Sequence, residues 1–378
     1  MRLSLHPASK AHILNKDIFY SFGRFYWKRK WLDFFSSKEA IGFCNGRTAL
    51  YFLLKNTQFK DKKEVIISAY TCPTVSKTIQ IAGYQVVYCD IDFDSGTMST
   101  TVLKTLINCN THSVITANTY GAIDNVIEIK RMLDDKDIYL FEDITWGIGS
   151  VFGIKPVGSY GDASFVSLGL GKNLTVGGGG ILLINSEKIQ QDVKENGYIF
   201  QTQPFNFLSF IKLFFYNGIT NKYIYKILHL FSLTPKDTVA SVDIESVLLC
   251  QSLDSYRKRL SSNTLTSFLQ LDLKVNFYVF NEIMKKKSTY IHHISKSTYS
   301  SNYSSRRPIL LNEDIKPSEF IEHMNSEGYQ ITRGFYQNKS NLNYAEHKNA
   351  IKYCDRLVTI PSNYSMTEVE LNNMVKLM

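Results

Sequence analysis

The chain has 378 residues, of which 44% are hydrophobic and 20% are charged, as in folded globular proteins. One hydrophobic core rarely serves a chain of this length, so we expect a large domain over 1–240 and a small one over 241–378. The net charge of +9 favours anionic ligands, but the basic residues are spread along the chain without any nucleic-acid-binding signature.

Cysteine usage and hydropathy indicate the compartment. The six cysteines are scattered without a CxxC pair, which predicts reduced thiols rather than a disulfide framework or a zinc site. No window approaches the ~18 uninterrupted apolar residues of a transmembrane helix. The first residues, MRLSLHPASKAHILNKD, contain no apolar core of signal-peptide length. We therefore expect a cytoplasmic protein without a metal site.

Residues 1–40 are aromatic and basic, which predicts a segment packed onto the main body. From residue 41 apolar strand-like runs alternate with helix-like segments. The predicted strands are 41–44, 65–68, 86–90, 113–118, 138–142, a run ending at Ser167, and 181–184, and the predicted helices are 48–55, 74–82, 101–108 and 125–133. This alternation predicts a mostly parallel sheet with helices on both faces, in which ligands bind at the carboxyl ends of the strands.

Residues 204–233 carry many apolar and aromatic side chains, interrupted by Lys212, Lys222 and Lys226. The preferred interpretation is two short helices buried against the body or against a second subunit. The alternative is an interfacial helix that docks on a membrane surface, because basic residues alternate with large apolar ones.

The C-terminal part is predicted to be a smaller α+β domain. A long helical stretch is expected to begin within 246–259. The later strands are predicted at 307–311 and 357–360, and the later helices at 317–327 and 367–377. Thr367 is the expected N-cap of the last helix, because Glu368 and Glu370 follow in its first turn.

The segment SFVSLGLGKNLTVGGGG, Ser164 to Gly180, places Lys172 between two strands and among many glycines. Glycines allow other groups to approach the backbone closely. A lysine whose site lowers its pKa becomes an amine that traps carbonyl groups, as in Schiff-base enzymes. A surface lysine in a hairpin is the alternative interpretation of this segment alone.

Two upstream segments have matching chemistry. The run Asn45-Gly46-Arg47-Thr48 begins a predicted helix and resembles an anion site built from free backbone N–H groups, although many helices begin this way without a ligand. Glu142-Asp143 ends a predicted strand, where a carboxylate needs a cation or a donor, and a structural salt bridge is the simpler alternative. Together, a phosphate anchor, an acid that keeps a ring nitrogen protonated, and a lysine are what pyridoxal phosphate needs.

The ordered motifs resemble the sugar aminotransferases of the DegT/DnrJ/EryC1/StrS family, which have the fold of fold-type-I pyridoxal phosphate enzymes. The resemblance is carried by NGRTALYFLL (45–54), EVIISAYTCPTVSKTIQIAGYQVVYCDID (64–92), NTYGAIDNVIEIK (118–130), FEDITWGIGS (141–150) and GSYGDASFVSLGLGKNLTVGGGG (158–180). It covers most of residues 41–186, and a weaker similarity extends from about residue 328 onward.

The resemblance implies roles for individual residues. Lys172 would bind the cofactor covalently and act as the acid/base, and Asp143 would pair with the ring nitrogen. Ser167 would bind the phosphate together with the backbone of Arg47 and Thr48. The family also implies a homodimer, glutamate as amino donor and a keto sugar carried by a nucleoside diphosphate, with a dTDP-linked 4-keto-6-deoxyhexose for surface polysaccharide as the expected substrate.

Several positions depart from the family pattern. Trp146 stands where a Gln or His is usual, and Cys72 where an aromatic residue often stacks on the cofactor ring. Both remain in the predicted cofactor site, and Trp146 or Tyr70 is expected to supply the missing ring packing. The family's Asn-Tyr-Arg segment, which helps close the neighbouring subunit's site, has no clear counterpart and is replaced by 204–233. Some relatives carry histidine in place of the lysine and are dehydratases, and Lys172 argues against that branch.

Two other functions stay open. One is an aminotransferase for a differently carried keto substrate at a membrane surface, reached through 204–233. The other is an inactive, cofactor-binding regulatory protein. Arg306, Arg307, Arg333 and Lys258 are candidates for binding the anionic part of the substrate.

Overall fold

The computed structural model describes residues 4–7, 12–21, 26–57, 59, 61–196, 207–231, 252–270, 291–293, 306–362 and 366–378. The proposed domain boundary at residue 240 and Cys250 lie outside these ranges. The five cysteines within them are free thiols, as the sequence predicts. Within the described ranges, no helix has both the length and the apolar character needed to cross a membrane.

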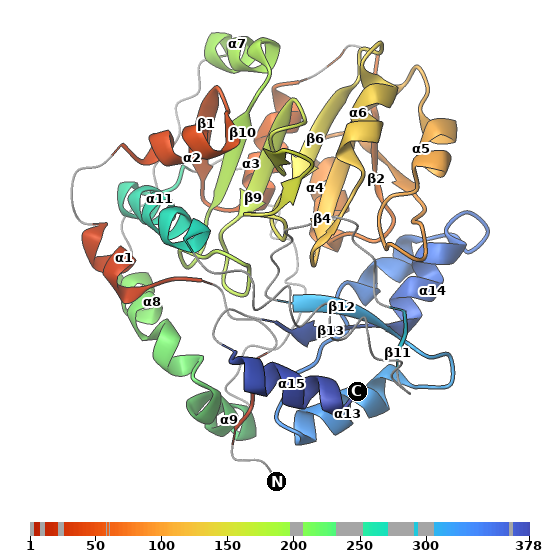
Figure 1. Cartoon of the computed structure of the whole chain (residues 1–378). Coiled ribbons are helices and arrows are strands. Elements are labelled where there is room, and N and C mark those ends of the chain that lie inside the picture. Colours follow the sequence, from red (N-terminus) through yellow and green to blue (C-terminus); the bar gives the residue numbers. More distant parts are fainter. Residues whose placement is uncertain are drawn as a thin grey trace.

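A mixed, mostly parallel sheet forms the centre of the molecule (Figure 1). Its main strands, in spatial order, are β1 (Glu39–Phe43), β10 (Gly180–Ile184), β9 (Ala163–Ser167), β6 (Tyr139–Asp143), β4 (Thr111–Thr119), β2 (Glu64–Ser68) and β3 (Gln85–Cys89). Among these, β10 runs antiparallel to both of its neighbours. The short β5 (Ala122–Ile123) folds back on the end of β4, and β7 (Val151–Phe152) pairs with β8 (Lys155–Pro156) in a separate hairpin. The predicted α/β fold with a mostly parallel sheet is confirmed.

The strands are apolar on both faces because helices cover both. Successive side chains point to opposite sides, so Val114 and Val166 lie in one core while Ile115 and Phe165 lie in the other. The first core also takes apolar side chains from α1 (Asn15–Tyr20), α2 (Trp27–Phe35), α5 (Thr100–Leu106), α6 (Val126–Leu133), α8 (Phe207–Ile219) and α11 (Ser255–Leu269). The second takes them from α3 (Gly46–Lys55), α4 (Pro73–Ile81) and α7 (Glu187–Glu195). The N-terminal segment thus packs onto the main body, with Trp31 fully buried, as predicted.

The C-terminal part is built on a second, antiparallel sheet of β11 (Ile291–His293), β12 (Arg306–Leu311) and β13 (Leu357–Pro361). Helices α13 (Pro317–Ser326) and α15 (Glu368–Lys376) share a core with it. A 3-10 helix (Tyr336–Asn341) precedes α14 (Lys348–Arg356), whose buried side chains pack with residues at the strand ends of the large sheet. Thr367 caps α15 in a reciprocal capping box with Glu370, which confirms that prediction.

The 204–233 stretch contains the two predicted short helices, α8 and α9 (Lys222–Leu230). Their inner side is buried, with Leu213 2% exposed, whereas their outer side leaves large apolar residues exposed: Phe207, Phe215, Tyr223, Ile224, Ile227 and Leu230. Among the described residues, the body of the chain therefore covers one side of the two helices and not the other.

The long helical stretch predicted to open at residues 246–259 is helical from Ser255 onward, and the described residues before it, 252–254, are not helical. Ser252 forms an isolated bridge with Phe43, and Asp254 accepts the Arg257 N–H as the N-cap, so α11 begins at Ser255. Pairing with a distant strand end keeps Ser252–Asp254 extended. Residues 246–251 lie outside the described ranges.

Candidate active site

One cavity of about 1010 Å³ lies at the carboxyl ends of the parallel strands. It has the size expected of a site for a cofactor together with a substrate. The predicted residues that line it are Arg47, Cys72, Asp143, Trp146, Ser167 and Lys172. Thr48 is fully buried behind the start of α3, where its N–H and its hydroxyl both donate to Asn45 Oδ1.

The start of α3 faces Ser167 at close range. Asn45 caps the helix, and the positive end of the helix dipole points toward the cavity edge. A Cβ added at Gly46 would lie 3.0 Å from Ser167 Cβ, so only glycine lets the helix end approach this serine. Across β10, a Cβ at Gly180 would lie 2.5 Å from the backbone of Asn45. The hydroxyl of Ser167 and the first backbone N–H groups of α3 therefore gather at one end of the cavity.

Lys172 lies in the loop between β9 and β10. Its Nζ lies 4.6 Å from the centre of the Trp146 ring, a cation–π contact that holds the amine inside the cavity. The glycines after it serve close packing: a Cβ at Gly177, which has φ +78°, would lie 3.1 Å from the Leu213 side chain of α8. The expectation that neighbouring groups approach this loop closely is confirmed.

The two adjacent acids at the end of β6 have different environments. Asp143 faces the cavity, and burial raises the pKa of its carboxyl, opposed by hydrogen bonds from Thr145 and by the charge of Lys172. The Thr145 N–H donates to Asp143 Oδ1 at 3.0 Å. Glu142 is fully buried and accepts the backbone N–H groups of Gly158, Tyr160 and Gly161 at 2.7–2.8 Å. Glu142 thus orders a loop, and Asp143 is the acid available to a ligand.

An aromatic wall closes another side of the cavity. Trp146 is 7% exposed and packs on Tyr120, which stacks on Phe335 at 5.1 Å between ring centroids. The Trp146 indole N–H has no partner among the described residues, although its backbone carbonyl accepts from the amide of Asn173. Tyr70, the other aromatic expected near the ring, is buried behind this wall against Phe335.

The candidate anion-binding residues separate into two groups. Arg306 and Arg333 line the cavity. Arg307 follows Arg306 on β12, so its side chain points to the opposite face of that sheet. Lys258 donates to Ser252 Oγ at 2.7 Å and packs on Gly42, and burial, followed by the charge of Lys28, lowers the pKa of its amine.

Sequence reasoning missed several lining residues. The wall opposite the sheet comes from α8 and α9, through Lys212, Leu213, Tyr216, Ile219, Thr220 and Tyr225, and from the C-terminal part, through Gln330, Thr332, Gly334 and Phe335. The unusual apolar density of 204–233 was the only signal for α8, and it did not reveal which side faces the site.

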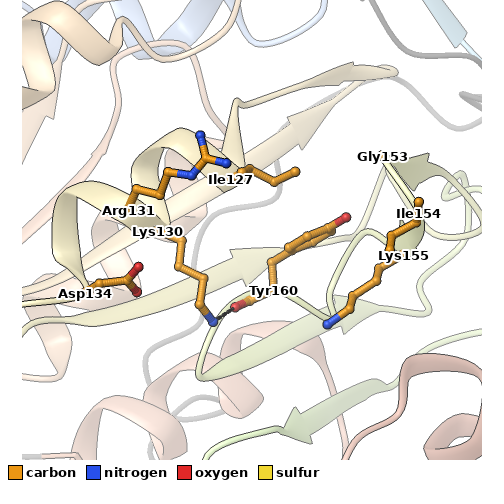
Figure 2. A pocket seen from close by; sticks show the side chains of 8 residues that line it. All are labelled: Ile127, Lys130, Arg131, Asp134, Gly153, Ile154, Lys155 and Tyr160. Carbon is orange, nitrogen blue, oxygen red and sulfur yellow. Dashed lines mark hydrogen bonds between the residues drawn. The ribbon is translucent and has the colours of Figure 1, made fainter.

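A second hollow, of about 490 Å³, lies between α6 and the β7–β8 hairpin, as Figure 2 shows. It is lined by Ile127, Lys130, Arg131, Asp134, Gly153, Ile154, Lys155 and Tyr160. Lys130 Nζ donates to the carbonyl of Tyr160 at 2.6 Å. Because none of the predicted site residues lines this hollow, the cavity at the sheet edge is the candidate site.

Comparison with known proteins agrees with this geometry. The chain is 29% identical to GDP-perosamine synthase of Vibrio cholerae over 163 residues, which cover 43% of this chain and only 44% of that protein. It is 22% identical to the GDP-4-keto-6-deoxy-D-mannose 3-dehydratase of Escherichia coli O55:H7 over 83% of this chain and 85% of that protein.

Among solved structures, Helicobacter pylori PseC, an aminotransferase involved in the biosynthesis of pseudoaminic acid, is similar in fold. Its TM-score is 0.75 at 16% identity, with 99% of this chain and 98% of that chain covered. Residues 14–206, about half of the chain, match a single family description. The chain belongs to the DegT/DnrJ/EryC1/StrS aminotransferase family.

Proposed function

We propose that this protein is a pyridoxal-phosphate-dependent aminotransferase that converts a keto sugar carried by a nucleoside diphosphate to the amino sugar. One observation carries the proposal: Lys172, Asp143, Ser167 and the start of α3 surround a single cavity. Membership of the family and the proteins named among its relatives support the same reaction class.

The residues present fit the cofactor. Ser167 and the backbone at Gly46 and Arg47 would hold its phosphate, whereas the N–H of Thr48, which the sequence also assigned to the phosphate, donates to Asn45 Oδ1. The carboxylate of Asp143 would hold positive charge at the ring nitrogen of the cofactor. Trp146 forms a wall whose buried indole N–H is available to a ligand oxygen. When bound, the cofactor supplies an electron sink for the substrate carbon that loses its proton.

The chain's own residues perform the remaining steps. With the cofactor bound, Lys172 would anchor it, and the Lys172 amine would remove and return the proton at the reacting carbon of the substrate. In its charged form the Lys172 amine lies against the Trp146 ring, which directs it into the cavity. The α8 wall and the aromatic wall restrict access of water to the reacting atoms.

The substrate class follows from size and charge. The cavity has room for a cofactor and a sugar nucleotide, and Arg333 in its lining supplies positive charge for the anionic part of that substrate. Two of the relatives named above, the perosamine synthase and the 3-dehydratase, carry GDP-linked sugars in their names, whereas the sequence leads us to expect dTDP. Both carriers belong in a substrate screen, with glutamate as donor, and the proposal retains a homodimer acting in the cytoplasm for polysaccharide synthesis.

The test compares absorbance spectra of the purified wild-type protein and Lys172→Ala with pyridoxal phosphate. We expect a visible band of lysine-bound cofactor in the wild type alone, which glutamate converts to the absorbance of the amine form. If the spectrum of the mutant matches that of the wild type, Lys172 is not the residue that binds the cofactor covalently. A band that no amino donor alters would favour the inactive regulatory protein.

The exposed outer side of α8 and α9 supports a second candidate, an enzyme that acts at a membrane surface. A face of this kind binds either lipid or a second subunit. Sedimentation with anionic vesicles separates the two, because a face covered in a homodimer leaves the protein in the supernatant.

A further inference from the structure

The proposed reaction needs an anchor for the amino donor, whose amine must reach the Lys172 region while its carboxylate meets a cation. Besides Lys172, the lining of the cavity includes four positively charged side chains among the described residues: Arg47, Lys212, Arg306 and Arg333. Their positions relative to Lys172 distinguish them.

Arg306 and Lys172 both contact the indole ring of Trp146. Its guanidinium carbon lies 5.7 Å from the centre of the Trp146 ring, and Lys172 Nζ lies 4.6 Å from the same point. The two cations are therefore at most about 10 Å apart, on a ring that attracts both. Both side chains line the same cavity, and this span is compatible with an amino acid whose carboxylate meets Arg306 and whose nitrogen meets Lys172.

The side chain of Arg306 is held in place. It is 8% exposed, and its Nη1 donates to Thr332 Oγ1 at 3.1 Å. The Thr332 hydroxyl is hydrogen-bonded in turn to Thr359 Oγ1 at 2.7 Å. A guanidinium fixed in this way presents its planar fork without a large loss of rotamer entropy, and exclusion of water strengthens its attraction for a carboxylate.

The other cations have different surroundings. Arg333 Nη2 donates to the carbonyls of Cys354 and Asp355 at the end of α14, which directs this nitrogen to a helix terminus. Arg47 stands at the start of α3, beside the proposed phosphate site, and Lys212 is exposed on α8.

The geometry points to Arg306 as the residue that binds the carboxylate of the amino donor, with Thr332 orienting the guanidinium and Trp146 holding it near Lys172. This inference rests on the proposed aminotransferase function. It also makes Arg306 an unfavourable partner for the diphosphate of the sugar nucleotide. In a 4-keto sugar the diphosphate is attached across the ring from the keto carbon that reacts, whereas Arg306 lies on the same indole ring as the reacting lysine.

The first test measures carboxylate binding without the reaction. Glutarate, a dicarboxylate that has no amine, is titrated by calorimetry into the full chain without added cofactor. We expect saturable binding to the wild type, at least tenfold weaker binding to Arg306→Gln, and intermediate binding to Arg306→Lys, which keeps the charge but loses the fork. Arg131→Gln, in the second hollow and outside the cavity, is the matched control and should bind glutarate within about twofold of the wild type. Thermal unfolding verifies that each variant is folded.

The second test separates the half-reactions in the cofactor-loaded enzyme. Arg306→Gln should raise the glutamate concentration needed for half-maximal conversion at least tenfold and leave the keto-sugar half-reaction within about twofold. Unchanged glutarate binding, or a loss confined to the keto-sugar half-reaction, would overturn the assignment. Failure of the proposed function gives a different result, because the wild type would then show no lysine-bound cofactor whatever its affinity for glutarate.

Discussion

At the scale of single residues, the site separates groups that are adjacent in sequence. Glu142 and Asp143 follow one another on β6, yet the first binds three backbone N–H groups and the second faces the cavity. On β12, Arg306 likewise lines the cavity, whereas the side chain of its neighbour Arg307 points to the other face of the sheet. Strand alternation explains both cases, because neighbouring side chains point to opposite faces.

Asp143 gives a pH prediction for the protein without cofactor. Burial raises its folded-state pKa, so the folded state binds the proton more tightly than the unfolded state does. Ionisation therefore costs stability as pH rises from the unfolded-state pKa to the folded-state pKa, and this cost persists at higher pH. Asp143→Asn removes the cost, and we expect its Tm to exceed that of the wild type by roughly 1–3 °C at pH 8 and to converge with it near pH 4.

The same substitution should weaken pyridoxal phosphate binding about tenfold at pH 8, because the carboxylate is lost from the ring nitrogen. Scanning calorimetry across pH and equilibrium dialysis of the cofactor measure the two effects. Opposite signs for protein stability and cofactor affinity are the diagnostic result. A parallel loss of both would instead show that Asp143 supports the fold.

At the scale of secondary-structure elements, local pattern predicts most of the fold. The strands and helices expected around the large sheet lie within two residues of the observed bounds, because alternation and capping are properties of short segments. The position of α8 over the cavity depends instead on a contact between Leu213 and Gly177, far apart in sequence, which leaves no local signal. The late start of α11 has the same cause, since Ser252 pairs with Phe43.

Leu213 tests whether α8 is part of the site. It is 2% exposed and rests on the glycine loop, so Leu213→Ala should lower the free energy of unfolding by about 2–5 kcal/mol and raise the KM for the keto sugar. Phe207→Ala is the matched control on the same helix. Phe207 is 62% exposed, and its loss should change stability by about 0.5 kcal/mol or less. Urea unfolding measures the change in stability, and steady-state kinetics measures the change in KM. Equally small effects of the two substitutions would mean that α8 does not pack against the glycine loop.

At the scale of the whole molecule, the cavity depends on how the C-terminal part meets the large sheet. An aromatic and aliphatic cluster joins Tyr70, Tyr120 and Trp146 to Phe335 and Tyr353 across this junction. The N-terminus adds a further link, because His6 bridges to Tyr329 of the C-terminal part. Arg306 and Lys172 come from opposite sides of the junction, so their separation is set by the packing of the two parts.

Asp90 is the polar anchor of that packing. Its carboxylate, at the end of β3, accepts the backbone N–H groups of Asn349 and Ala350 at 3.1 and 2.8 Å, at the start of α14. An anion at a helix N-terminus stabilises by about 0.5–2 kcal/mol, and the acceptor here belongs to a different part of the molecule from the helix. Asp90→Ala should therefore lower stability by about 1–2 kcal/mol and also loosen the junction.

Asp90→Ala should affect binding of the amino donor more than binding of the cofactor, because Asp90 joins the two parts of the molecule. Cofactor-binding residues of the large sheet keep their mutual positions in Asp90→Ala, so the lysine-bound absorbance at saturating cofactor should match that of the wild type. Glutamate affinity should fall, because Arg306 moves relative to Lys172. Asp90→Asn keeps an acceptor for the helix N-terminus and should recover part of both losses. A loss of the cofactor band in Asp90→Ala would show instead that the junction organises the cofactor site itself.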